Sequence, residues 1–562
     1  MTCNTFLCWA TALLCLLLAQ ESSALPETDY GPILDLGYAK YQGVRYSSLG
    51  FNLFQGIPYA APPVGNLRWR APVPIEKYLN NHDKNVARNA THPGKICVQG
   101  ATTWGSNTTI NLPSQSEDCL VMDVYTPLLP RSKNLPIAVN IHGGGYITGY
   151  NLDNSHLSSY ANGSLIIVNI QYRLGFYGFL GSNEIQKDGT ANAGFLDQRA
   201  ALEWIQRNAP AFGGDPKKVT IWGGSAGGGS VMAQMMLHGG EERPPFRAAA
   251  AEFPGFLPFK GPGIVNGQYQ ALLATTNCST LQCLRDTPEP ALDTATKNAY
   301  AIGWTQGRYG YGDFWVTPTV DGKAIKELPS DAFKNGHFSK VPLLTDHSSW
   351  EGEGFTNLSI TTKADVQHNF ERFWQIRNES FFKQLLSLYP PSTYDTTYFS
   401  NPTWKEVIAI FPSFAKVIGD QPWAQAAGIW GDVVIRCTSW VVATGSSGVG
   451  MPTWKMFVDA GYKLHGVSDS YIQGAPNSTG NPPLESAMKD YFVSFFVNAD
   501  PNQPVPGVLA PASQQPHWPL YSSGGSQGAV LGVTDKTLDV IPDPEDSDKC
   551  RFYQKHNALI GV

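Results

Sequence analysis

The sequence predicts an α/β protein in which helices flank a central, mostly parallel β-sheet. Three short apolar segments, at residues 135–141, 165–170 and 218–222, are rich in β-branched side chains. Such segments are typical of strands that are buried on both faces of a sheet. Between the second and third segments, residues 191–208 place apolar side chains at helical spacing. Strands that alternate with helices in this way indicate a parallel or mixed sheet with helical cover.

The composition supports a well-packed globular protein. Of the 562 residues, 42% are hydrophobic and 15% are charged, and the formal net charge is −6. This balance excludes an intrinsically disordered chain. The net negative charge provides no basis for nucleic-acid binding, so we expect no nucleic-acid partner.

The first 24 residues are predicted to be a cleaved signal peptide. An apolar run at residues 13–19 precedes polar residues and the small-x-small sequence Ser22-Ser23-Ala24. This pattern predicts export and cleavage near residue 24. The alternative, an N-terminal membrane anchor, requires a longer apolar run. Because no second long apolar run follows, we expect a secreted, extracellular mature chain without an integral membrane segment.

Cysteines and glycosylation sequons agree with export. Six of the nine cysteines lie beyond residue 24, and an even number suggests full disulfide pairing. None of the six is in CxxC spacing, so we expect neither a zinc site nor another cofactor. Candidate glycosylation sites occur at Asn89, Asn107, Asn162, Asn277, Asn357, Asn378 and Asn477.

Residues 25–562 are predicted to form a single domain, because no linker-like segment divides them. The stretch from about 360 to 440 carries aromatic residues at helical spacing, such as Phe370, Phe373 and Trp374. We interpret it as helical insertions that could line a pocket. Ordinary packing between helices explains any single aromatic residue equally well.

Ser225 is the candidate nucleophile. It lies in Gly223-Gly224-Ser225-Ala226-Gly227, directly after one predicted strand and before a predicted helix at residues 226–237. This G-x-S-x-G context is that of a nucleophile elbow, in which small neighbours permit a tight turn. A second match around Ser526 lies in a Ser/Gly-rich loop without a preceding strand, and we interpret it as a flexible turn.

A glycine run supplies a candidate oxyanion hole. His142-Gly143-Gly144-Gly145 follows the predicted strand at residues 135–141. Consecutive glycines allow backbone N–H groups to approach a substrate oxygen without interference from Cβ atoms. Together with the elbow, this run predicts the N–H groups of Gly144, Gly145 and Ala226 as oxyanion donors.

The base and the acid are less well determined by pattern. An elbow serine is followed along the chain by an acid and then by a histidine. His465 follows a plausible strand, whereas the alternatives His517 and His556 lie in a Pro-rich loop and in the terminal segment. For the acid, the predicted strand at residues 341–345 is followed by the carboxyl groups of Asp346, Glu351 and Glu353, which spacing alone does not separate.

Several long motifs resemble the type-B carboxylesterase and cholinesterase family of α/β-hydrolases, and in particular its secreted, fungal-like members. Residues 212–227 resemble the serine signature of this family, and residues 117–127 resemble a second signature. Residues 54–69 are similar to the N-terminal block, and residues 172–175 with 197–199 are similar to the central block. The resemblance implies an α/β-hydrolase fold and the hydrolysis of a small-molecule or lipid ester.

The resemblance also implies site residues and bonds. The acid of the family lies in an E-G-x-x-F context, which selects Glu351 over Glu353, and its base lies in a His-Gly pair, which selects His465. The implied disulfides are Cys97–Cys119, Cys278–Cys283 and Cys437–Cys550, and the implied buried ion pairs are Arg68–Glu117 and Arg173–Asp197.

Two departures from the family pattern bear on function. Many members carry Glu before the nucleophile, where this chain has Gly224. Trp104 is not in the W-N-P context of cholinesterases, and the Cys97–Cys119 loop is short for a lipase lid. We therefore expect a carboxylesterase. A triacylglycerol lipase or sterol esterase is the alternative, and a non-catalytic adhesion protein is disfavoured because Ser225, Glu351 and His465 are all present.

Overall fold

The computed structural model describes residues 29–79, 86–101, 104, 114–394, 396–508, 515–522, 528–545 and 547–562. The predicted signal peptide, Asn107 and Ser526 lie outside these residues, as does most of the Cys97–Cys119 loop.

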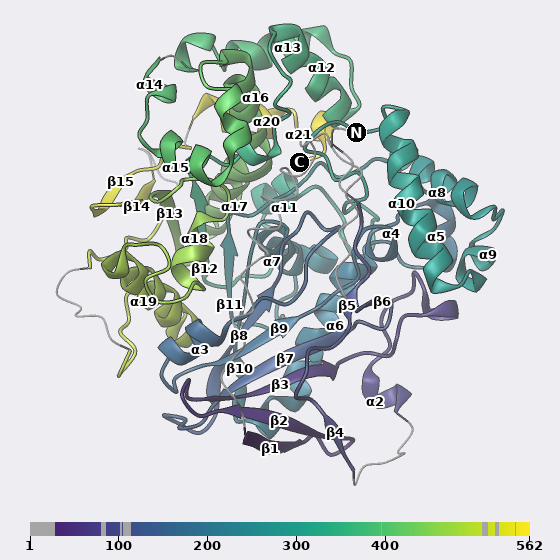
Figure 1. Cartoon of the computed structure of the whole chain (residues 1–562), viewed down its shortest axis with the longest axis vertical. Coiled ribbons are helices and arrows are strands. Elements are labelled where there is room, and N and C mark those ends of the chain that lie inside the picture. Colours follow the sequence, from purple (N-terminus) through teal and green to yellow (C-terminus); the bar gives the residue numbers. More distant parts are fainter. Residues whose placement is uncertain are drawn as a thin grey trace, which may run out of the picture.

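One large sheet runs through the described chain, with strand order β1-β2-β3-β7-β9-β8-β10-β11-β12-β13-β14-β15 and β4 paired with β2 (Figure 1). The pairs from β9 through β8 to β14 are parallel, and so is the pair of β2 with β4; the other pairs, toward the two edges, are antiparallel. The strands are β1 (Asp29–Asp35), β2 (Lys40–Tyr46), β3 (Phe51–Pro58), β4 (Ala87–Asn89), β7 (Val121–Pro127), β8 (Leu135–Ile141), β9 (Ile166–Ile170), β10 (Gly214–Gly224), β11 (Ala248–Glu252), β12 (Leu343–Ser348), β13 (Thr453–Asp459), β14 (Ala529–Thr534) and β15 (Leu538–Pro542).

The predicted α/β fold class is confirmed, and the predicted central strands are β8, β9 and β10. Every residue of β8 is buried, and its side chains alternate between two cores. Ile137 and Val139 belong to the core that includes helices α6 (Ala193–Asn208) and α7 (Ala226–Met236). Ala138 belongs to the core that includes α19 (Pro482–Asn498). The sheet is therefore apolar on both faces, which explains the unbroken apolar runs in the sequence.

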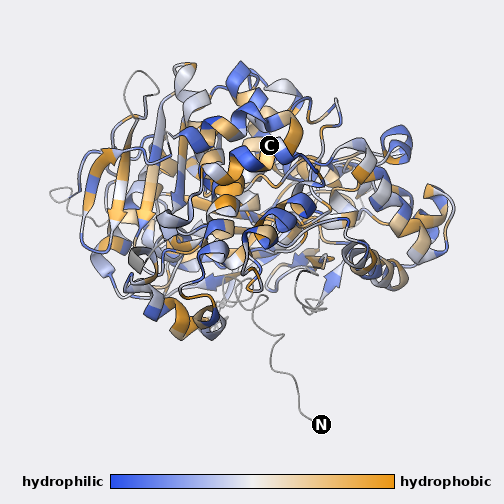
Figure 2. Ribbon diagram, turned by 90° about the horizontal axis from the view of Figure 1, so that it is seen from above, coloured by the Kyte–Doolittle hydropathy of each residue, from blue (hydrophilic) through white to orange (hydrophobic). Residues whose placement is uncertain are grey.

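Further helices lie over the end of the sheet at the top of Figure 1, where the carboxyl ends of the parallel strands emerge. They are α12 (Lys363–Trp374), α13 (Glu379–Ser387), α15 (Thr403–Ile410) and α16 (Gln421–Gly431), whereas α17 (Cys437–Gly448) packs against β12 and β13. Within the described residues, one continuous helical stretch, Gln421–Gly448, is long and apolar enough to cross a membrane. Its most apolar window is 89% buried inside the fold, as in a core helix, and Figure 2 shows apolar colour on helices in the interior.

Covalent and ionic links join distant parts of the chain. The three disulfides implied by the family resemblance are formed, Cys97–Cys119, Cys278–Cys283 and Cys437–Cys550. Both implied ion pairs are formed as well and are buried: Arg68 Nη2 lies 2.5 Å from Glu117 Oε1, and Arg173 Nη2 lies 2.7 Å from Asp197 Oδ1.

Candidate active site

Ser225 lies in a sharp turn between β10 and α7. Its backbone angles, φ 60° and ψ −125°, are unusual for a residue with a side chain. The turn is tight: a Cβ on Gly223 would lie 2.3 Å from the Ile141 carbonyl oxygen, and one on Gly227 would lie 2.1 Å from the same atom. Only glycine therefore fits at positions 223 and 227, and the Ser225 hydroxyl is presented at the carboxyl end of β10.

The loop after β8 places the glycine run beside Ser225. Gly144 and Gly145 both have positive φ, +101° and +63°, which favours glycine. A Cβ on Gly144 would lie 2.1 Å from the Thr148 carbonyl oxygen, and one on Gly145 would lie 2.3 Å from the Phe314 ring. Within the described chain, the N–H groups of Gly144, Gly145 and Ala226 donate to no acceptor, so they are available to a ligand oxygen.

The acid and the base meet because their two loops pair with each other. The Trp350 N–H donates to the Lys463 carbonyl (3.0 Å), and Trp350 forms a parallel bridge with Leu464. The next residue on each side is then brought into contact: Glu351 Oε2 lies 2.5 Å from Nδ1 of His465. The other carboxylate oxygen of Glu351 accepts the Ser348 N–H (2.5 Å). Both oxygens are thus held, and both side chains are buried.

The other acid and base candidates lie elsewhere. Glu353 accepts a hydrogen bond from the Tyr398 hydroxyl (2.8 Å), and Asp346 Oδ1 accepts the Phe253 N–H (2.7 Å). The His556 ring packs against Phe552, while His517 lines a separate surface pocket beside Asp490.

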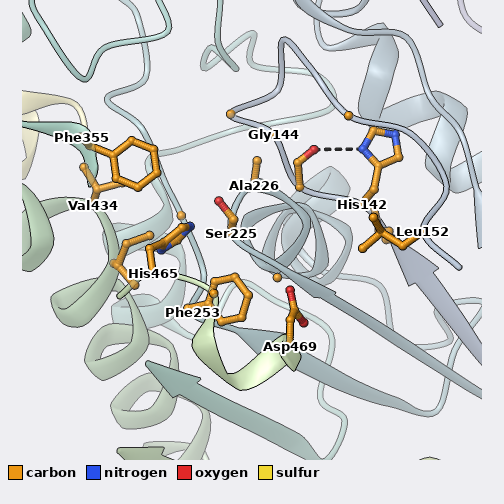
Figure 3. Close-up of a pocket in the computed structure, with 18 of the residues that line it drawn as sticks. His142, Gly144, Leu152, Ser225, Ala226, Phe253, Phe355, Val434, His465 and Asp469 are labelled. Carbon is orange, nitrogen blue, oxygen red and sulfur yellow. Dashed lines mark hydrogen bonds between the residues drawn. The ribbon is translucent and has the colours of Figure 1, made fainter. Parts of the chain in front are cut away.

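Ser225 and His465 line one pocket of about 190 Å³, which is open to solvent (Figure 3). The Nε2 atom of His465 is buried and has no hydrogen-bond partner among the described residues. Because Glu351 accepts from Nδ1, Nε2 of the neutral ring is the proton acceptor. The imidazole and the hydroxyl are thus presented to the same space.

The pocket is lined by both apolar and polar side chains. The apolar residues include Phe253, Leu257, Phe314, Phe355, Trp430, Val434 and Ile435, and the polar residues include Tyr462, Asp469, Ser470 and Gln473. Of the aromatic residues in the 360–440 stretch, Trp430 reaches the pocket, whereas Phe370, Phe373 and Trp374 pack on one another in the core. Trp104 is also a core residue, with its ring against Phe314 and its indole N–H on the Asp313 carbonyl.

Three carboxyl groups lie together at the pocket, of which Glu252 and Asp346 are buried and Asp469 is half-buried in the pocket wall. Of the three, Asp346 alone was a candidate acid from the sequence. Glu252 ends β11, Asp346 lies in β12 and Asp469 follows His465. Burial raises the pKa of Asp346 to about 6 and that of Asp469 to about 7, and it raises the pKa of Glu252 well above its ordinary value. Repulsion from neighbouring carboxylates adds to each shift: from Asp469 and Asp346 on Glu252, from Asp346 on Asp469, and from Glu351 on Asp346. Only the tertiary structure brings these strand ends together, so no sequence signal marked the group.

One cluster has the residue types of a metal site. His347, Asp543 and Glu545 place their ligand atoms within 4.8 Å of one another. The Lys455 ammonium lies among them, 2.5 Å from Asp543 Oδ1 and 3.3 Å from Glu545 Oε2. The cluster is therefore a buried ion-pair group in which lysine supplies the positive charge.

Comparison with known proteins identifies the family. The sequence pattern of the carboxylesterase family matches residues 30–418. The chain belongs to the carboxylesterase family. It is 30% identical over 508 residues to secreted lipase 1 of Botryotinia fuckeliana, covering 84% of each chain. It is 28% identical over 603 residues to the carboxylesterase patB of Aspergillus clavatus, covering 97% of this chain and 99% of that one.

A solved structure agrees with this assignment. Aspergillus niger EstA matches with a TM-score of 0.79 and 25% identity over 94% of this chain and 99% of that one. This member of the carboxylesterase family is therefore a carboxylic ester hydrolase. Ser225 and Glu351 lie within the matched family segment, and His465 lies beyond it.

Proposed function

We propose that this protein is a secreted serine carboxylesterase that uses Ser225 as nucleophile, His465 as base and Glu351 as orienting acid. One observation carries the proposal. Glu351 holds Nδ1 of His465 at 2.5 Å, while the unpartnered Nε2 and Ser225 share one pocket. An acid, an imidazole and a hydroxyl in this relation activate a serine.

The chemistry follows from these positions. Nε2 of His465 accepts the Ser225 proton as Oγ attacks the ester carbonyl carbon. The N–H groups of Gly144, Gly145 and Ala226 stabilise the oxyanion, an effect of about 3 kcal/mol per donor. The C–O bond to the alcohol then breaks, and His465 returns its proton to the leaving alkoxide. Water attacks the acyl-enzyme with the same base and releases the carboxylic acid.

The mixed lining of the pocket indicates a substrate with both an apolar and a polar group. Phe314, Trp430 and Val434 offer apolar surface for a hydrocarbon group, whereas Asp469 and Gln473 offer hydrogen-bond acceptors. The Gln473 Oε1 atom is buried and has no partner among the described residues, so a substrate hydroxyl would satisfy it. We infer an ester that joins an apolar group to a hydroxyl-bearing one.

Secretion belongs to the same proposal. Curated relatives are named secreted lipases. Of the sequon asparagines in the described residues, Asn89, Asn162, Asn277, Asn378 and Asn477 are exposed and Asn357 is half-buried. Their exposure is compatible with glycans added during export. The proposal assigns the whole described chain to one catalytic domain.

The test is Ser225→Ala. The variant should lose hydrolysis of short p-nitrophenyl esters and labelling by a fluorophosphonate probe, by about 10³-fold or more. The wild-type protein should become labelled once per chain. Retained hydrolysis in the alanine variant would remove Ser225 from its role, and a wild-type chain that neither labels nor hydrolyses would favour a non-catalytic protein.

A triacylglycerol lipase is the second candidate, because relatives that match over most of the chain are named lipases. Hydrolysis rates with tributyrin below and above its solubility limit separate the two activities. An abrupt rise when the emulsion forms would favour the lipase, and smooth saturation below the limit would favour the esterase.

A further inference from the structure

The ring of Phe253 lies where a side chain on residue 224 would be. A Cβ on Gly224 would lie 2.2 Å from Phe253 Cζ, 2.6 Å from Cε2 and 3.0 Å from Cε1. Real Cβ atoms do not approach carbon this closely, so residue 224 is glycine because the phenyl ring occupies its side-chain space. Gly224 pairs with Glu252 on the neighbouring strand, and Phe253 is the residue that follows.

The backbone around Phe253 is fixed to Ser225 on both sides. The Ser225 N–H donates to the Glu252 carbonyl (3.2 Å), and the Gly255 N–H donates to the Ser225 carbonyl (2.8 Å). Between these bonds, the Phe253 N–H donates to Asp346 Oδ1 (2.7 Å). Phe253 adopts a φ of +29°, which a bulky residue keeps only where its surroundings enforce it. The ring therefore has a defined position relative to the nucleophile.

The same ring contacts His465. The two ring centroids are 5.0 Å apart at an interplanar angle of 81°, which is an edge-to-face contact. Phe355 makes a matching contact with the imidazole, at 5.1 Å and 85°. Glu351 makes the one hydrogen bond to the imidazole, at Nδ1, among the described residues, so packing must also restrict rotation of the ring about its Cβ–Cγ bond. The two phenyl rings oppose that motion. Figure 3 shows His465 and Phe355 to the left of Ser225 and the ring of Phe253 below it.

We propose that Phe253 is a positioning residue for His465, and that glycine at 224 is required to give it room. The inference rests on the proposed role of His465. It predicts that a methyl group at 224 acts by displacing the phenyl ring and, through it, the imidazole.

A double-mutant cycle tests the proposal, with Gly224→Ala, Phe253→Ala and the double variant assayed on p-nitrophenyl butyrate. Gly224→Ala should lower kcat about tenfold or more, since small displacements of a catalytic group have effects of this size. Phe253→Ala should lower kcat by a similar factor. In the Phe253→Ala background, Gly224→Ala should change kcat less than about twofold, because the methyl group then has space. KM should move less than kcat throughout.

A matched control uses Phe314, whose ring lines the same pocket and lies against Trp104 and Phe355. Phe314→Ala combined with Gly224→Ala should give additive changes in kcat. Phe253→Leu, which keeps most of the side-chain volume, should fold with a melting temperature near that of the wild type and still show a reduced kcat.

Two results would overturn the proposal: an equal effect of Gly224→Ala in both backgrounds, or an unchanged kcat in a folded Phe253→Leu variant. Either result leaves the proposed function standing if wild-type activity still depends on Ser225. Activity that persists in the Ser225→Ala variant is a separate outcome, and it would contradict the proposed function instead.

Discussion

The two sides of the pocket around Ser225 are built in different ways. On one side, Gly144, Gly145 and Ala226 present backbone N–H groups, and the positions of these groups follow from tight local turns. On the other side, His465 is held by side chains from two other segments: Glu351 and Phe355 after β12, and Phe253 after β11. The positions of the proposed oxyanion donors thus depend on the absence of side chains, whereas the position of the proposed base depends on contacts between side chains that are distant in sequence.

The largest effect is expected on the side of the pocket where side chains hold His465. Glu351→Gln removes the charge that holds His465 and leaves an amide facing Nδ1, so kcat should fall by about 10³-fold or more. Steady-state rates on p-nitrophenyl butyrate would measure it. The matched control is Glu353→Gln, a buried neighbour bonded to Tyr398. That variant should remain within about threefold of wild type, and the reverse order would exchange the roles of the two residues.

The second largest effect is expected on the side of the pocket formed by Gly144, Gly145 and Ala226. Gly144→Ala places a methyl group 2.1 Å from the Thr148 carbonyl oxygen at a φ of +101°. The turn must move, the N–H donors lose their alignment, and kcat should fall by about 10²-fold.

The control for that prediction is Gly50→Ala. Gly50 also has a positive φ, +81°, but a Cβ there meets nothing within 4 Å. Backbone strain should lower the melting temperature of the Gly50→Ala variant, while its kcat should stay unchanged. Equal kcat values in the Gly144→Ala variant and the wild type would show that the glycine run is not an oxyanion hole.

The smallest effect concerns the carboxyl groups of Glu252, Asp346 and Asp469. Burial raises the pKa of Glu252 well above its ordinary value, so the folded protein keeps a proton that the unfolded chain releases near pH 4. The folded state therefore loses stability as the pH rises above about 4. Asp346, with a pKa of about 6, and Asp469, with a pKa of about 7, act in the same direction up to those values.

The side chain in the Glu252→Gln variant cannot ionise, so its free energy of unfolding should decline less steeply than that of the wild type between pH 5 and 7.5, by up to about 1.4 kcal/mol per pH unit. Urea unfolding at several pH values would measure this difference. The exposed Glu242→Gln is the control and should follow the wild-type curve. A steeper decline in the Glu252→Gln variant would contradict the sign of the pKa shift.

Much of the fold was predictable because local patterns report burial directly. The apolar runs of β8 and β9 lie in a sheet covered on both faces, so every side chain had to be apolar, and their bounds were predicted to within one residue. The acid was not predictable from spacing, because Asp346, Glu351 and Glu353 all lie close to the end of β12. Only the bridge between Trp350 and Leu464 turns Glu351, and not its neighbours, toward His465.

The sequence by itself determined the central strands, the elbow at Ser225 and the glycine run, because each is a local pattern, either of apolar side chains or of glycines that permit a tight turn. The tertiary structure decided the partner of His465, the buried acids and the reason for Gly224. These features depend on strand ends that are far apart in sequence. Phe253 lies 29 residues from Gly224 along the chain, yet its ring fills the space in which a Cβ on Gly224 would lie.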